Sequence, residues 1–153
     1  MAFVLILLAT SLTALMVGFW CTWGFFVLPA LDQVPPTAAV ASMRSLNESV
    51  LKPVFLVPFF ALPVLSAAAA LVLAADGAPI AAGLFGFAVV FQALVIVVTG
   101  TMNVPLNEQL AHTEAAAEEA WAAFSSAWQR AHRLRAVASG MALACCAAAW
   151  WVR

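Results

Sequence analysis

Long runs without charged residues constrain the possible folds of this chain more than any other feature of its sequence. Six basic and seven acidic residues are present, yet four segments contain no Asp, Glu, Lys or Arg: Met1–Leu31, Pro53–Ala75, Gly77–Asn107 and Ala136–Val152. A bilayer core about 30 Å thick is crossed by about 20 apolar helical residues. A chain with 66% hydrophobic and 8% charged residues is not an ordinary soluble domain. The runs therefore predict an integral membrane protein with four transmembrane helices.

The expected fold is all-α: a four-helix membrane bundle in one domain, residues 1–153. Its membrane helices are expected at about 2–31, 54–75, 79–101 and 135–151. Polar segments 32–53 and 102–134 join these helices and should form a cap on one side of the membrane. We expect an interfacial helix at 38–51 in the first segment. The second should contain an amphipathic helix, because apolar residues recur there at 4-3-4 spacing: Ala117, Trp121, Phe124 and Trp128.

The distribution of Lys and Arg predicts the orientation. The two long loops hold Arg44, Lys52, Arg130, Arg133 and Arg135, whereas the opposite side holds only Arg153. Basic residues concentrate on the cytoplasmic side, so both loops are expected in the cytoplasm and both termini outside. The first apolar run lacks a basic start and is too long for a signal peptide, so we expect it to stay as a helix. No basic block indicates nucleic-acid binding, and a homo-oligomer is left open.

The most unusual polar residues lie on the third helix and just after it. Gln92, Thr99, Asn103 and Asn107 are 7, 4 and 4 residues apart and share one stripe of a regular helix. Amides in hydrocarbon are costly without partners, so this stripe should face protein or a wet cavity. Two interpretations are open: hydrogen bonds between helices, or the lining of a binding site. In the second, the cavity is lined by Asn47, Gln92, Thr99, Asn103, Asn107 and Trp128.

A second face carries Trp128, His132 and Arg135 at spacings of 4 and 3. His132 is a candidate proton carrier or metal ligand. Arg135 is a candidate partner for a phenolate or carboxylate, and the alternative is that both basic residues lie at the lipid headgroups. Glu108 and His112 at i, i+4 form, with His132, a weak set of candidate metal ligands. The three cysteines show no redox or zinc spacing.

One motif is similar to a known family. Thr99-Gly100-Thr101-Met102-Asn103-Val104-Pro105-Leu106-Asn107, followed by Leu110-Ala111, resembles the signature of the DUF1772 family, which includes the anthrone-oxygenase-like membrane proteins. Supporting matches are 24–26, 28–31, Met43 with Asn47, and Trp128 with Arg135. The family often carries Asn where this chain has His132, so the resemblance does not support a role for that residue.

The resemblance implies a four-helix membrane fold and, in some members, oxidation of an anthrone by dioxygen. The leading hypothesis is a small-molecule oxygenase for a hydrophobic phenolic substrate that enters from the lipid, with dioxygen as co-substrate and a transition metal left open. His132 or water would take a proton from carbon, and Asn103, Asn107 and Arg135 would stabilise the oxyanion. The alternative is a non-enzymatic lipid or quinone binder, a small transporter or an accessory subunit. Since no charged residue is expected inside the bundle, ion-coupled transport is disfavoured.

Overall fold

The structure is a computed structural model that describes residues 2–153 of the chain. It is all-helical, with the elements α1 (Ala2–Thr22), η1 (Trp23–Val27), α2 (Leu28–Leu31), α3 (Pro36–Ser49), α4 (Pro53–Ala75), α5 (Pro79–Val98), η2 (Thr99–Asn103), α6 (Val104–His112) and α7 (Ala117–Ala149). Both η elements are π-helical turns. They join their neighbours into two continuous rods, 2–31 and 79–112. The third predicted helix therefore extends well beyond residue 101.

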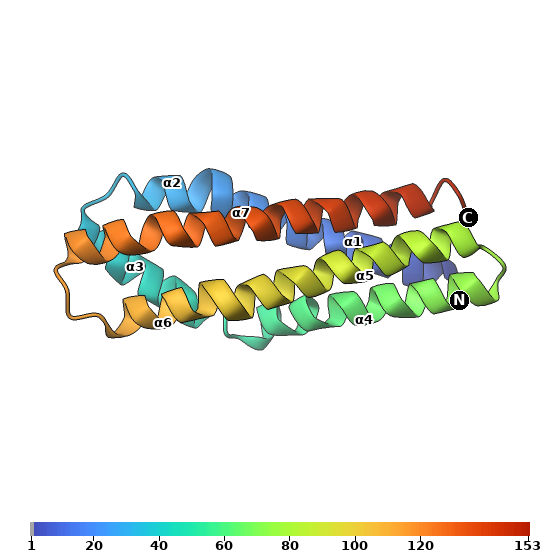
Figure 1. Cartoon of the computed structure of the whole chain (residues 1–153), viewed down its shortest axis with the longest axis horizontal. Coiled ribbons are helices and arrows are strands. Elements are labelled where there is room, and N and C mark those ends of the chain that lie inside the picture. Colours follow the sequence, from blue (N-terminus) through green and yellow to red (C-terminus); the bar gives the residue numbers. More distant parts are fainter. Residues whose placement is uncertain (1) are drawn as a thin grey trace.

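Proline and glycine define where the helices begin and turn. Pro36, Pro53 and Pro79 each occupy the first position of a helix, where the missing N–H costs nothing. The turn between α4 and α5 contains Gly77 with a φ of 78°, a left-handed conformation that a side chain disfavours. The two helices consequently lie antiparallel and pack along their length. Figure 1 shows this turn at the same end as the two chain termini.

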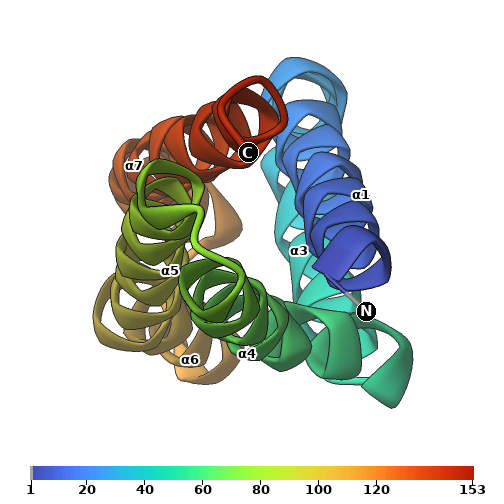
Figure 2. The same ribbon diagram turned by 90° about the vertical axis from the view of Figure 1, so that its right-hand side faces the viewer.

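The long helices pack around a shared interior. α1 contacts α4 and α7, and α5 contacts the same two helices, an arrangement visible end-on in Figure 2. Near the termini this interior consists largely of fully buried small residues: Ala9, Ala69, Ala81, Ala88 and Ala142. Small side chains let helices approach closely. At the other end α3 packs against α6 and α7, and the interior becomes aromatic.

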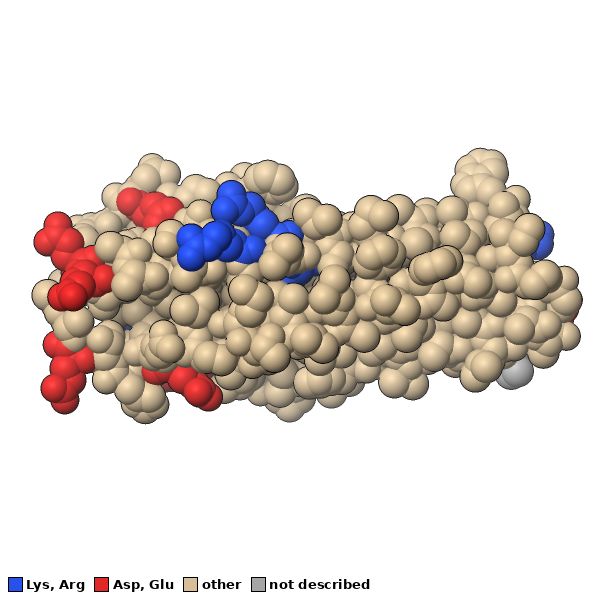
Figure 3. Space-filling model, viewed as in Figure 1, with Lys and Arg blue, Asp and Glu red and all other residues tan. Residues whose placement is uncertain are grey.

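Three helical segments are long and apolar enough to cross a membrane: Ala2–Leu31, Pro53–Ala75 and Pro79–His112. Their outward faces carry large exposed apolar side chains, such as Leu15, Leu71 and Val90. In Figure 3 acidic side chains gather at the end that holds α3 and the loop between α6 and α7, and a basic patch lies next to them toward the middle of the molecule. An uncharged surface covers most of the remaining length. The chain is therefore an integral membrane protein.

α7 differs from these three segments. It is continuous over Ala117–Ala149, but Arg130, Arg133 and Arg135 interrupt its middle. The uncharged portion inside the helix is 136–149, which is shorter than the roughly 20 residues of a typical span. This helix therefore combines the amphipathic cap segment and the fourth predicted membrane helix in one rod.

Candidate functional site

A cavity of about 540 Å³ lies at the capped end of the molecule. Its walls come from α1 and η1, the end of α3, the start of α4, the stretch from α5 through α6, and α7. This volume is typical of small-molecule sites, which usually enclose about 300–1,000 Å³. Five of the six residues predicted to line one cavity do so: Asn47, Thr99, Asn103, Asn107 and Trp128.

Aromatic side chains form most of the apolar wall. They are Phe19, Trp20, Trp23, Phe55, Phe59, Phe60 and Trp128. The rings contact one another: Phe55 stacks on Phe59 with centroids 5.4 Å apart, and Trp23 lies 5.4 Å from Trp128. Flat rings that pack against each other in this way make a surface suited to a planar apolar ligand.

Arg135 supplies a positive charge to the buried part of the cavity. Its side chain is 4% exposed, and its guanidinium carbon lies 4.6 Å from the Trp20 ring centroid and 5.1 Å from that of Trp128. Such cation–π contacts favour a desolvated guanidinium. Arg135 lies at the edge of an uncharged run, where sequence cannot distinguish a headgroup contact from an inward side chain. The structure places it inward, which corrects the expectation that no charged residue lies within the bundle.

The hydrogen bonds of Arg135 are few and long. Nη1 lies 3.4 Å from the Thr99 hydroxyl, and Nη2 lies 3.4 Å from Nδ1 of His132. Nε has no partner within the described residues. Good N–H donors to oxygen sit about 2.7–3.2 Å from their acceptors, so the guanidinium retains much of its capacity to donate.

His132 lies behind Arg135 and does not line the cavity. Its ring stacks on Trp128, with centroids 5.2 Å apart and planes 9° apart. Nε2 lies 3.0 Å from the Trp20 carbonyl oxygen, so Nε2 carries the proton and donates it to this bond. Nδ1 is then the acceptor that faces Arg135. Both ring nitrogens thus have protein partners, and His132 is placed to hold Arg135 rather than to contact a ligand.

Gly24 in η1 makes room for this histidine. A Cβ atom built on Gly24 would lie 3.1 Å from His132 Nε2, which is closer than nine in ten real Cβ contacts. The π-helical turn η1 ends two residues before Pro29, as η2 ends two residues before Pro105. Proline lacks an N–H and clashes with the preceding turn, and a wider π turn relieves that clash. Both wide turns lie beside the cavity and contribute lining residues, Trp23 from η1 and Thr99 and Asn103 from η2.

The amides of η2 and α6 differ in how they are satisfied. Asn107 accepts a 2.8 Å hydrogen bond from the Trp128 indole N–H through Oδ1, which leaves its NH₂ group for another partner. Asn103 is 1% exposed, and neither its oxygen nor its nitrogen has a partner among residues 2–153. Asn47 Nδ2 is also buried without a partner among the described residues. Buried amides are almost always hydrogen-bonded, so these atoms indicate where a polar ligand group would bind.

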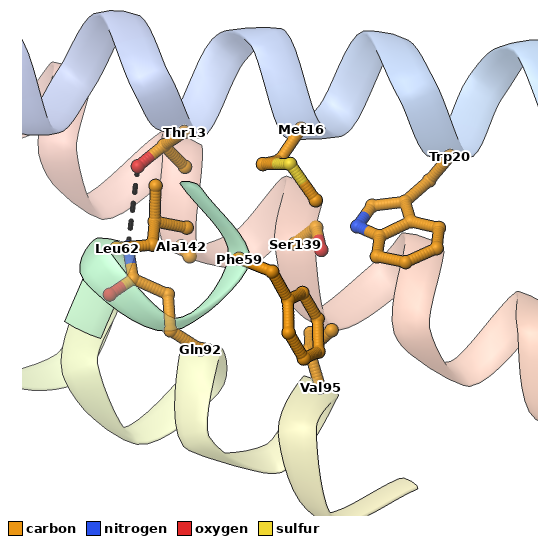
Figure 4. A pocket seen from close by; sticks show the side chains of 9 residues that line it. All are labelled: Thr13, Met16, Trp20, Phe59, Leu62, Gln92, Val95, Ser139 and Ala142. Carbon is orange, nitrogen blue, oxygen red and sulfur yellow. Dashed lines mark hydrogen bonds between the residues drawn. The ribbon is translucent and has the colours of Figure 1, made fainter. Parts of the chain in front are cut away.

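Gln92 lies elsewhere, although it shares the predicted stripe. It donates a 3.3 Å hydrogen bond to Thr13 and lines a separate cavity of about 10 Å³ (Figure 4). Seven residues separate it from Thr99, which is about 10 Å along a helix axis. Trp20 and Phe59 line both cavities and lie between Gln92 and the larger one. The structure thus gives Gln92 an interhelical contact, the first of the two interpretations.

The candidate metal ligands are only partly brought together. Glu108 and His112 both line the mouth of the larger cavity and are exposed, whereas His132 does not line it. Residues 2–153 contain no cluster of three or more His, Cys, Asp or Glu side chains that would hold a metal ion. A metal at Glu108 and His112 stays a prediction.

The cap is held together by hydrogen bonds of two charged residues, Arg44 and Asp32, for which the sequence predicted no role at the site. Arg44 donates from Nε to the Leu110 carbonyl oxygen at 2.9 Å and also lines the cavity. Asp32 accepts hydrogen bonds from Trp121 at 3.0 Å and from Gln129 at 3.1 Å. Their partners lie 66 to 97 positions away, so no local pattern indicates these contacts.

Comparison with known proteins agrees with the predicted family. Residues 52–145, more than half of the chain, match the family model described as anthrone oxygenase. No curated protein and no solved structure shows a significant match. The matched region runs from the start of α4 into α7 and includes Thr99, Asn103, Asn107, Trp128 and Arg135. The chain therefore belongs to the anthrone oxygenase family.

Proposed function

We propose that this protein is a membrane-embedded oxygenase that oxidises a hydrophobic phenolic compound of the anthrone type with dioxygen. The observation that carries the proposal is one cavity in which an aromatic wall meets a buried guanidinium and an unpaired amide, those of Arg135 and Asn103. The family match favours an anthrone over other aromatic compounds. We further propose that α7 crosses the membrane with the other three segments, so that the protein is a four-helix bundle.

Substrate binding follows from the layout of the cavity. The fused rings of an anthrone would lie against Phe55, Phe59 and Trp23, with a ring oxygen toward Arg135 and Asn103. Asn47, Thr99 and Asn107 would orient the remaining phenolic groups, and Trp128 would pack against the rings. Leu51, Phe60 and Val104 line the cavity and are also exposed at the apolar surface. This rim supports entry of the substrate from the lipid.

The proposed chemistry begins at the CH₂ carbon opposite the anthrone carbonyl. Loss of a proton to water at the cavity mouth leaves a carbanion whose charge moves onto the carbonyl oxygen. Arg135 and Asn103 would stabilise this oxyanion by donating hydrogen bonds in a site of low polarity. Dioxygen then adds to the carbon. Overall, CH₂ and O₂ become C=O and H₂O: the carbon is oxidised, one oxygen atom stays on it, and the other leaves in water.

The test uses the purified chain in lipid nanodiscs with a hydroxyanthrone. Oxygen uptake, anthraquinone absorbance and transfer of ¹⁸O from ¹⁸O₂ into the new carbonyl should all exceed the values in empty nanodiscs. Asn103→Leu should lower the rate at least tenfold, whereas Arg133→Gln, an exposed change on α7, should leave it unchanged. Rates equal to those of empty nanodiscs at every substrate concentration would refute the proposal.

A quinone binder is the second candidate. It is favoured by the largely apolar lining and by the absence of an acid–base side chain from the buried lining among residues 2–153, where Arg135 is the charged group. Such a protein would retain a quinone through purification and bind it saturably without oxygen uptake.

A further inference from the structure

We infer that the cavity binds its ligand as an oxyanion, so that a phenol or enol that enters as the neutral acid ionises in the site. This inference names the charge state of the ligand and rests on the cavity of the proposed function. It does not require any oxidation. Three features support it: a buried cation without an anionic partner, unpaired donors that line the same cavity, and walls that are otherwise apolar.

The first feature is the charge of Arg135. Its hydrogen-bond partners among residues 2–153 are the Thr99 hydroxyl and His132 Nδ1, and neither is a carboxylate. The guanidinium stays protonated in proteins. A buried cation is costly unless it is paired, and the usual partner is an anion. The two tryptophan faces at 4.6 and 5.1 Å compensate this cost only in part.

The second feature is the position of the unpaired donors. Arg135 Nε, Asn103 Nδ2 and Asn47 Nδ2 are buried, lack partners among residues 2–153, and belong to residues that line this cavity. They come from α7, η2 and α3. Asn103 Oδ1 is an unpaired acceptor in the same lining. Three donors against this one acceptor match an oxygen atom with several lone pairs better than they match a group that only donates.

The third feature is the surroundings of these groups. The other charged or titratable lining residues are Arg44 and Glu48 from α3, and Glu108 and His112 from α6. Glu48, Glu108 and His112 are exposed at the mouth, whereas Arg135 is 4% exposed. Arg44 is half-buried and donates to the Leu110 carbonyl oxygen. The fully buried lining therefore carries one positive charge, that of Arg135, and the walls around it are largely apolar. The ligand that fits is an aromatic anion with a single ionised oxygen directed inward.

The experiment uses 4-nitrophenol, whose phenolate has its own visible absorption band, and the purified full-length chain in detergent. The phenolate band is followed as a function of pH, with and without protein. In the site, the ionisation midpoint of the probe should lie at least one pH unit below its value in protein-free micelles, which is about a tenfold stronger acid. 4-Nitroanisole, which cannot ionise, should compete at least tenfold more weakly.

Variants of Arg135 and of a matched control residue show which side chain causes the shift of the ionisation midpoint. Arg135→Gln should abolish the shift, and Arg135→Lys should retain part of it, because the charge is kept and the planar fork is lost. Arg133→Gln removes the same charge from an exposed position on the same helix and should leave the midpoint unchanged. If Arg135→Gln does not fold, the midpoint shift is compared between wild type and Arg135→Lys, together with the competition by 4-nitroanisole. A smaller shift in Arg135→Lys and weak competition would support the inference, and equal shifts or strong competition would contradict it.

Three results would overturn the inference: a midpoint equal to that in micelles, equal shifts in the Arg135 and Arg133 variants, or no saturable binding of 4-nitrophenol. Its failure is separable from that of the oxygenase proposal. An Arg135-dependent shift without oxygen uptake would keep the anion site and reject the oxygenase, and oxygen uptake without a shift would do the reverse.

Discussion

At the scale of single residues, the site depends on a chain of contacts behind Arg135. Gly24 makes room for His132, His132 donates to the Trp20 carbonyl and accepts from Arg135, and Trp20 covers one side of the guanidinium. Neither Gly24 nor His132 needs to touch a ligand to affect it. We expect a shift of a few tenths of an ångström at Gly24 to be transmitted, because His132, Trp20 and Arg135 are buried in a closely packed interior.

Gly24→Ala tests this chain of contacts. A methyl group at Gly24 forces His132 away from the Trp20 carbonyl, so we expect anthrone oxidation and 4-nitrophenolate binding to fall severalfold. Alanine in place of glycine usually stabilises a helix by about 0.5–1 kcal/mol. Here we expect no such increase in stability, because the methyl group displaces His132. Gly18→Ala is the matched control in α1, because a Cβ there meets nothing within 4 Å. Equal activity in both variants would contradict the positioning role.

Variants of Asn103 and Gln92 distinguish a ligand-binding amide from a structural one. Asn103→Ala should impair binding and turnover with little loss of thermal stability, because its amide has no protein partner among residues 2–153. Gln92→Leu should leave both functions intact, since Gln92 bonds to Thr13 outside the larger cavity. Its stability change should stay within about 1 kcal/mol, as is usual for hydrogen bonds between membrane helices. Melting temperatures and oxidation rates measured side by side decide this, and loss of turnover in Gln92→Leu alone would reverse the assignment.

At the scale of elements, two π-helical turns shape the site. η1 presents Trp23 and lies beside His132, and η2 presents Thr99 and Asn103. A π turn carries one residue more than an α turn, so it changes which side chains face the interior beyond it. Pro29 and Pro105 follow these turns at the same offset. Pro58 and Pro63, by contrast, lie in α4 without a π turn.

Pro105→Ala tests the role of η2. Alanine restores the missing N–H, so the turn should relax toward an α-helix and rotate Asn107 relative to Asn103 by about 100°, one residue of an α-helix. We expect the hydrogen bond from Trp128 to Asn107 to be lost and turnover to fall at least tenfold, while the melting temperature does not decrease. Pro58→Ala should leave turnover unchanged. Full turnover in Pro105→Ala would show that η2 is not needed for the site.

At the scale of the whole molecule, the two ends of the helix bundle are packed differently. The end near the termini has a filled interior, and the capped end contains the cavity. Alanines fill the interior near the termini, whereas aromatic residues and the cavity occupy the capped end. Both long connections, between α2 and α4 and between α6 and α7, lie at the capped end (Figure 1). A ligand in this cavity would therefore lie close to one membrane surface.

Labelling of single introduced cysteines tests the proposed topology. Ser45 lies in α3 and Ser125 in the first part of α7, whereas Gly77 lies in the turn at the opposite end (Figure 1). In Ser45→Cys and Ser125→Cys the new thiol should react with an impermeant maleimide only from the cytoplasm. In Gly77→Cys it should react only from outside, because Lys and Arg concentrate in the long loops.

The background for this labelling is a chain in which the three native cysteines are first replaced by Ala: Cys21, Cys145 and Cys146. This cysteine-free chain is the control for nonspecific labelling. Reaction at positions 45 and 77 from the same side of the membrane would reject the proposed topology.

The membrane environment, the all-helical class and the family could be predicted from the sequence, because uncharged runs, helical periodicity and a short motif are local properties. The helix bounds were predicted less well, since the helix expected at 79–101 continues to residue 112 and the one expected at 135–151 begins at Ala117. The sequence also identified Asn103, Asn107, Trp128 and Arg135 as unusual, since polar groups in apolar segments need partners. Three features followed from the packing of the helices: the inward direction of Arg135, the separation of Gln92 from the larger cavity, and the close approach of Gly24 to His132. These depend on helices that are distant in sequence: periodicity fixes the face on which a side chain lies, and packing alone fixes what that face meets.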